Sequence, residues 1–125
     1  PTIETVLPRF QQFTQDTILI AHNAAFDMRM LQISEPTTGI RFINPVLDTL
    51  LLSALIHPAH NTHTINQISQ RLGVEVTDRH SAVGDAITTA KIFLKMIPLL
   101  ADLKIITLGE ARIAARKTYY ARLKY

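Results

Sequence analysis

The spacing of apolar and polar residues divides the chain into short apolar runs, each followed by a segment with helical periodicity. Residues 17–21 and 46–48 are short apolar or β-branched runs, which are typical of buried strands. Apolar residues spaced by three and four predict the longest helix, at 82–97. Further helices are expected at 2–13, 25–33, 49–56, 65–72 and from 107 onward. This alternation predicts an α/β layer with a partly parallel sheet.

Two capping boxes mark helix starts more sharply than periodicity does. Thr64 is followed three positions later by Gln67, and Thr107 by Glu110. In this pattern the hydroxyl and the longer side chain satisfy backbone amides of the first turn reciprocally. Gly73 follows the first of these helices, where a helix C-terminus favours a left-handed residue.

The predicted sheet has too few strands to be complete. Two strands are marginal by themselves, and sheets of this class usually contain more. We therefore expect an incomplete sheet whose N-terminal strands lie before Pro1 in a longer protein. The strand at 17–21 would then have an open edge. We expect that edge to pair with the missing N-terminal part of the same domain or with a second copy of the chain.

Composition narrows the class of protein. The 125 residues suffice for one domain with a core, and the mean hydropathy of +0.15 is slightly apolar. The absence of cysteine excludes disulfides and thiolate metal sites and fits a cytoplasmic protein. No apolar run is long enough to span a membrane, so no membrane partner is expected.

The net charge of +3 comes from the C-terminal end of the chain. Residues 103–125 hold six Lys or Arg against Glu110 alone, whereas the rest is close to neutral. We expect residues 104–125 to form a basic helical extension. Such a helix can contact phosphate, although solvated basic helices are commoner than nucleic-acid readers.

Candidate chemistry lies in two runs that share a spacing. Residues 18–27 read ILIAHNAAFD and residues 80–86 read HSAVGDA, so Asp27 follows His22, and Asp85 follows His80, by five positions. Residues five apart diverge by about 140° on a helix. Each His is therefore expected on a strand end or loop, and each Asp in the next helix. Two such carboxylates are half of a two-cation cluster, and a loop His suits a general base.

A plainer interpretation of the same residues needs no catalysis. Asn23 is a common N-cap residue, and Asp27 and Asp85 would each stabilise a helix N-terminus through the helix dipole. Phe26 would pack in the core. Either spacing alone arises by chance, but both together, in order and at strand-to-helix or loop-to-helix junctions, are harder to dismiss.

Together the two runs resemble the second and third motifs of the DnaQ-like (DEDDh) 3′–5′ exonucleases. The resemblance implies a ribonuclease H-like α/β fold, removal of nucleotides from DNA or RNA 3′ ends, and two divalent cations, Mg²⁺ or Mn²⁺. It assigns Asp27 and Asp85 as catalytic metal ligands and His80 as the catalytic general base. The other motif residues are expected to frame or bind the substrate: His22, Asn23 and Phe26.

The resemblance extends over residues 1–103, which would form a partial DEDDh domain. Its first motif, an Asp-x-Glu on an earlier strand, has no counterpart here, so metal binding should be weak and the chain alone nearly inactive. The alternative is a catalytically inactive DnaQ-like domain that serves as a docking or regulatory module. Asp48-Thr49-Leu50 resembles the family's DTL segment, and Asp48 is interpreted as a helix cap. His57, His60 and His63 are interpreted as a solvated loop in preference to a zinc site.

Overall fold

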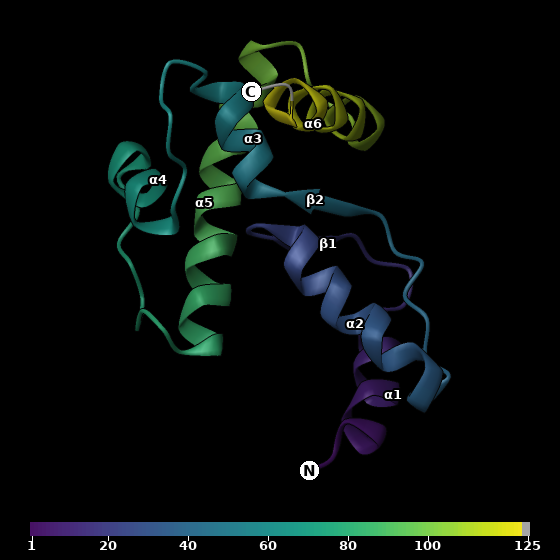
Figure 1. The fold of residues 1–125 in the computed structure, drawn as a ribbon. Coiled ribbons are helices and arrows are strands. Elements are labelled where there is room, and N and C mark those ends of the chain that lie inside the picture. The colour runs from purple at the N-terminus through teal and green to yellow at the C-terminus, as the bar shows by residue number, and fades with distance from the viewer. Residues whose placement is uncertain (124–125) are drawn as a thin grey trace.

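The computed structural model describes residues 1–123 as six helices around a small parallel sheet (Figure 1). The strands are β1 (Leu19–Ala21) and β2 (Val46–Asp48). The helices are α1 (Ile3–Thr14), α2 (Ala24–Thr38), α3 (Thr49–Ile56), α4 (Ile65–Leu72), α5 (Ala82–Asp102) and α6 (Leu108–Leu123). The expected α/β alternation is therefore present in the first half of the chain.

The sheet is formed by two parallel strands in register, with Ile20 opposite Leu47. The Leu19 amide donates to the Pro45 carbonyl over 2.9 Å, so the backbone of Leu19 faces β2. Alternate residues of a strand direct their backbone groups to opposite sides, and those of Ile20 therefore point away from β2. In the part of the chain that the structure describes, no strand pairs with this second edge of β1.

The core lies between the sheet and the helices that follow it. Leu52 of α3, Ile68 of α4 and Ile92 of α5 are fully buried. Helix α5 contacts α3, α4 and β1, and α6 contacts α3 and β2 (Figure 1). Helices α1 and α2 contact each other at the opposite end of the molecule. This arrangement aligns the C-terminal end of β1 with the N-terminal half of α5.

Both capping boxes are confirmed. The Thr64 hydroxyl accepts from the Gln67 amide, the Gln67 side chain accepts from the Thr64 amide, and Gly73 is left-handed at the end of α4. At α6, the Thr107 hydroxyl accepts from the Glu110 amide over 3.1 Å. Hydrogen bonds to the Glu110 carboxylate, first from the Ile106 amide, lower the pKa of Glu110.

Several predicted boundaries were wrong. Strand β1 begins at Leu19, because its short pairing partner begins only at Val46. Helices α2 and α5 continue past their expected ends, through Pro36 to Thr38 and through Pro98 to Asp102. A proline removes one intrahelical hydrogen bond. Near a helix end, beside solvent, water can satisfy the carbonyl that this leaves free, so the helix need not stop.

The interpretation of residues 57–63 as a solvated loop was wrong for His63, which is 4% exposed. Its Nδ1 lies 2.7 Å from the Ser53 hydroxyl and 3.1 Å from Arg71 Nη1, and its Nε2 lies 3.0 Å from the His60 carbonyl. An arginine can only donate and a carbonyl can only accept. His63 is therefore a neutral ring protonated on Nε2, held as part of the core.

Candidate active site

Asp27 and Asp85 line the same cavity, although 58 positions of sequence separate them. The cavity has a volume of about 690 Å³ and lies between the end of β1, the first turn of α2 and the N-terminal half of α5. His22 lines it as well. The rest of the wall is mainly apolar: Ile20, Ala21, Ile65, Ala82, Ala86, Thr89, Ala90, Phe93 and Leu94. Two carboxylates and an imidazole therefore face a largely apolar hollow.

Asp27 stands in the first turn of α2, as the spacing predicted. Partial burial of its carboxyl group raises the pKa of Asp27, and the negative charge of Asp48 raises it further. His22 works in the opposite direction. The cavity thus favours a partner that supplies positive charge to this carboxylate.

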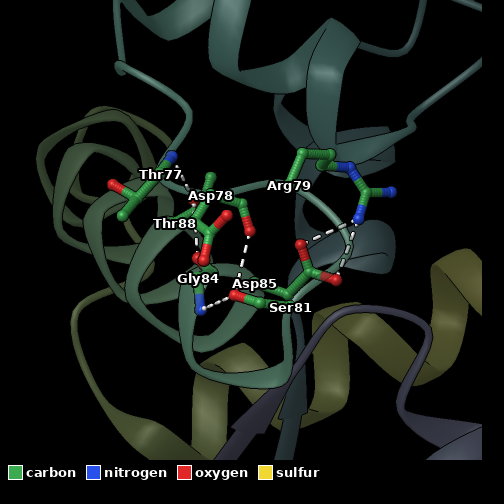
Figure 2. A network of polar contacts seen from close by, with 7 residues as sticks. All are labelled: Thr77, Asp78, Arg79, Ser81, Gly84, Asp85 and Thr88. Atoms are coloured by element: carbon green, nitrogen blue, oxygen red, sulfur yellow. Dashed lines mark hydrogen bonds and ion pairs between the residues drawn. The ribbon is translucent and has the colours of Figure 1, made fainter.

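Asp85 stands in the first turn of α5 and is held by an arginine (Figure 2). Arg79 Nη1 donates to both carboxylate oxygens, over 2.8 and 2.9 Å. Both side chains are about one third exposed. Sequence reasoning did not identify Arg79, because a basic residue six positions before an aspartate has no periodic relation to it. The loop between them turns back and brings the two together.

A tight turn at the start of α5 sets the direction of this carboxylate (Figure 2). The Ser81 hydroxyl accepts from the Gly84 amide over 2.9 Å and donates to the Asp78 carbonyl over 3.0 Å. The Thr77 amide donates to the Thr88 hydroxyl over 3.0 Å. A side chain at Gly84 would collide with the carbonyls of Asp78 and Thr77. The preceding loop therefore packs on the helix only because position 84 is glycine.

His22 occupies the end of β1 and is mostly enclosed. Burial lowers the pKa of His22, and the nearby Asp48 carboxylate opposes this effect. Its Nδ1 lies 2.9 Å from the hydroxyl of Thr49, the first residue of α3. The hydrogen bond to Thr49 of α3 therefore fixes the orientation of the ring, which also lines the cavity.

The other predicted site residues lie elsewhere. His80 is exposed, has a left-handed backbone with φ of 75°, and is not among the residues that line the cavity. Phe26 is 65% exposed, so its interpretation as a core residue was wrong. Asn23 occupies the N-cap position of α2, but its side chain makes no capping hydrogen bond, because its backbone is left-handed. The predicted catalytic and substrate-binding roles of these three residues stay predictions.

The donor chemistry of the cavity fits a divalent cation, but the number of donors does not suffice. Carboxylate oxygens are the ligands that Mg²⁺ prefers. Among residues 1–123, however, no three His, Asp or Glu side chains are grouped closely enough to hold a metal ion. Arg79 also occupies both oxygens of Asp85. By themselves, the described residues supply part of a metal site.

Two further findings concern the surface. A hollow of about 790 Å³ between α1 and residues 41–45 is larger than the cavity, but Asp16 is the one carboxylate in its wall. We assign no chemistry to it. Within residues 1–123, no helix combines the length and apolar character that crossing a membrane requires.

Comparison with known proteins identifies the family of the chain. Residues 1–93 match the family model described as "Exonuclease". The chain is 40% identical over 119 residues to a DNA polymerase III subunit epsilon-like protein of Rhodobacter capsulatus, covering 94% of the chain and 17% of that protein. It is 37% identical over 111 residues to a PolC-type DNA polymerase III of Staphylococcus aureus, covering 88% of the chain and 8% of that protein. No solved structure matches.

Two carboxylates from separate strand-to-helix and loop-to-helix junctions line one cavity within an α/β layer. With the family match over residues 1–93, the chain belongs to the DnaQ-like exonuclease family. It spans less than one fifth of the length of the curated relatives described above.

Proposed function

We propose that this chain is part of a 3′–5′ exonuclease domain that hydrolyses phosphodiesters at DNA or RNA 3′ ends. The observation that carries the proposal is the meeting of Asp27 and Asp85 at one cavity. These two residues come from the two runs that resemble the family's motifs.

In this proposal Asp27 and Asp85 hold two divalent cations, Mg²⁺ or Mn²⁺, together with carboxylates from another segment. When bound, such a pair generates a nucleophile from water and compensates the charge of the phosphate oxygens. Burial and the charge of Asp48 raise the pKa of Asp27, which a bound cation would offset, whereas Asp85 is already paired with Arg79. Arg79 would leave Asp85 or turn toward the phosphate when the cations bind.

The segment that completes the site is proposed to add a strand to the open edge of β1. Ile18 and Ile20 are exposed at this edge, and the backbone of Ile20 points outward from it. Beside the edge, α5 exposes apolar residues, including Leu94 and Ile97. An apolar strand of the same domain fits this surface. It would pair with the free backbone N–H and C=O groups of β1, and its side chains would cover the exposed apolar residues of α5.

His80 is proposed as the general base. It precedes Asp85 in the loop that leads into α5, and its side chain is exposed to solvent, where a general base can reach water. His22, Asn23 and Phe26 are proposed to frame the terminal nucleotide. Asn23 and the exposed ring of Phe26 lie at the N-terminus of α2, the helix whose first turn carries Asp27.

The alternative function is a docking or regulatory module that kept the fold without catalysis. The Arg79–Asp85 ion pair favours it, because a permanent arginine would neutralise the carboxylate that a cation needs. The two proposals make opposite predictions for activity in a protein that holds a complete sheet.

The experiment is a nuclease assay on labelled single-stranded oligonucleotides with Mn²⁺, using this chain and the longest natural protein that contains it. We expect trace activity from the chain and stepwise 3′ shortening by the longer protein. In the latter, Asp85→Asn should abolish shortening and His80→Ala should slow it by roughly 10²–10⁴-fold. Asp102→Asn, at the far end of the same helix, is the matched control and should leave the rate unchanged.

Two results would contradict the proposal. Robust shortening by the chain alone, lost in Asp85→Asn, would mean that the site needs no further segment. An inactive longer protein would support the docking module.

A further inference from the structure

Asp48, at the end of β2, caps two helices at once. As the sequence predicted, its Oδ1 accepts from the Leu50 amide over 2.9 Å and so caps α3. The same carboxylate also contacts the start of α2, the helix that follows β1. Its Oδ1 accepts from the Asn23 amide over 2.9 Å, and its Oδ2 accepts from the Ala24 amide over 3.0 Å. Three backbone amides from two helix starts therefore share one side chain.

This second cap replaces the one that Asn23 does not make. Asn23 is left-handed, with φ of 59°, a conformation that costs free energy in a residue other than glycine. Charged hydrogen bonds to its own amide and to the next one hold it there. The turn at Asn23 determines where α2 begins and thus where the first turn, with Asp27, points.

The neighbouring Thr49 fixes the other polar group of the cavity. Thr49 is fully buried, and its hydroxyl lies 2.9 Å from His22 Nδ1 and 3.4 Å from the Ala21 carbonyl. A buried hydroxyl between two such groups leaves the imidazole one favourable orientation. Asp48 and Thr49 are consecutive, so a single strand-to-helix junction orients both His22 and the start of α2.

We propose that Asp48 and Thr49 are positioning residues for the cavity. Asp48 holds the N-terminus of α2 so that Asp27 lines the same cavity as Asp85, and Thr49 sets the orientation of the His22 ring. Asp48 is not itself a cation ligand in this account, because backbone amides already occupy both of its oxygens. The proposal rests on the proposed function only where it gives Asp27 its role.

The test is NMR of the 125-residue chain with the variants Asp48→Asn, Thr49→Val and Thr49→Ser. Asparagine retains one acceptor oxygen, which fits best at the Oδ1 position because two amides converge there. We therefore expect amide exchange of Ala24 to rise at least tenfold, while the Asn23 and Leu50 amides stay protected. The control is Thr107→Ala, which removes the cap of α6 and should leave Ala24 unchanged.

The ring of His22 tests the second half of the proposal. Thr49→Val, which has the same shape without the hydroxyl, should shift the ring ¹⁵N resonances of His22. Thr49→Ser, which keeps the hydroxyl, should restore them. A purely structural role would be satisfied by the matching shape of valine and would leave the ring resonances in place.

A functional readout separates positioning from stability alone. Mn²⁺ broadens NMR signals near its binding site, so broadening at Asp27 should need several-fold more Mn²⁺ in Asp48→Asn than in Thr107→Ala. Unchanged Ala24 exchange in Asp48→Asn, or unchanged His22 resonances in Thr49→Val, would overturn the proposal. The exchange and ring measurements decide the positioning role whether or not Mn²⁺ acts on the unsubstituted chain, and the proposed function is decided by the nuclease assay on the longer protein.

Discussion

At the scale of single residues, Gly84 sets how closely the loop before α5 can pack on that helix. A Cβ there would overlap the carbonyls of Asp78 and Thr77, which are backbone atoms and cannot rotate away. Gly84→Ala should lower the free energy of unfolding by about 1–3 kcal/mol, as overpacked sites do. Urea unfolding measures this change.

The control for this variant is Gly109→Ala in α6, where an added Cβ meets no atom within 4 Å. Alanine is the better helix former, so this change should be neutral or stabilising by up to about 1 kcal/mol. Equal effects of the two substitutions would mean that the packing at Gly84 is not as described.

The buried ring of His63 makes stability depend on pH. Burial lowers the pKa of His63 in the folded chain below its ordinary value near 6.5, and Arg71 lowers it further. The unfolded chain therefore binds the proton more readily. Stability should be fully present above about pH 6.5 and decrease as the pH falls toward the folded-state pKa. Burial also lowers the pKa of His22 and of His57, so both add to the loss of stability at low pH.

The measurement is urea unfolding of the chain and of His63→Gln at pH 7.5 and 5.0. The loss of stability at pH 5.0 should be smaller in His63→Gln than in the parent chain. His60→Gln, which leaves the buried ring in place, is the control. An identical loss in all three proteins would exclude His63 as a source of the pH dependence.

Residue types and local spacing predicted the local features of the site but not its long-range contacts. The capping box of Thr64 and Gln67 formed as expected, because both partners lie within one turn. The Asp48 bonds to Asn23 and Ala24 join residues 25 and 24 positions apart. No sequence period encodes such a pair. The arginine on Asp85 was missed for the same reason.

At the scale of elements, α6 is docked on the rest of the domain. Its Ala111 and Ala115 are 5% and 8% exposed and belong to the core cluster with Leu47 and Leu52. The basic residues of α6 lie among exposed positions on its remaining faces. The division into residues 1–103 and a 104–125 extension stays a prediction, but the helix itself packs against α3 and β2.

Enlarging the contact face of α6 should therefore destabilise the whole domain. Ala115→Leu should cost about 1–3 kcal/mol of unfolding free energy, because the added carbons have no space against α3. Ala121→Leu adds the same atoms at an exposed position of the same helix and should change stability by less than about 0.5 kcal/mol. If Ala115→Leu changed the unfolding free energy as little as Ala121→Leu, α6 would not pack against the core as described.

At the scale of the whole molecule, the described sheet has two strands, and β1 has an open edge. The pattern predicted both strands, a parallel sheet and an open edge, although β1 is shorter than the predicted run of residues 17–21. What covers that edge cannot be derived from these residues, because backbone hydrogen bonds accept any extended segment.

The isolated chain should self-associate through this edge. Apolar residues exposed beside it, such as Ile18 and Leu94, add a hydrophobic reason for pairing. Light scattering coupled to size exclusion should find dimers or larger species whose fraction rises with concentration. Ile20→Lys, which places a charge on the edge, should reduce association, whereas Ile113→Lys on the exposed side of α6 should not. A monodisperse monomer in which the Ile18 and Ile20 amides exchange slowly would contradict this prediction.

The proposal that Asp27 and Asp85 act on one cation in the cavity that both line is tested most directly by Mn²⁺-induced broadening of amide signals in the 125-residue chain. The account predicts that signals around Asp27 and Asp85 broaden together, at the same Mn²⁺ concentration, and that Asp85→Asn weakens broadening at both. Asp102→Asn should leave it unchanged. Broadening around one aspartate without the other, or equal broadening around Asp102, would contradict the account.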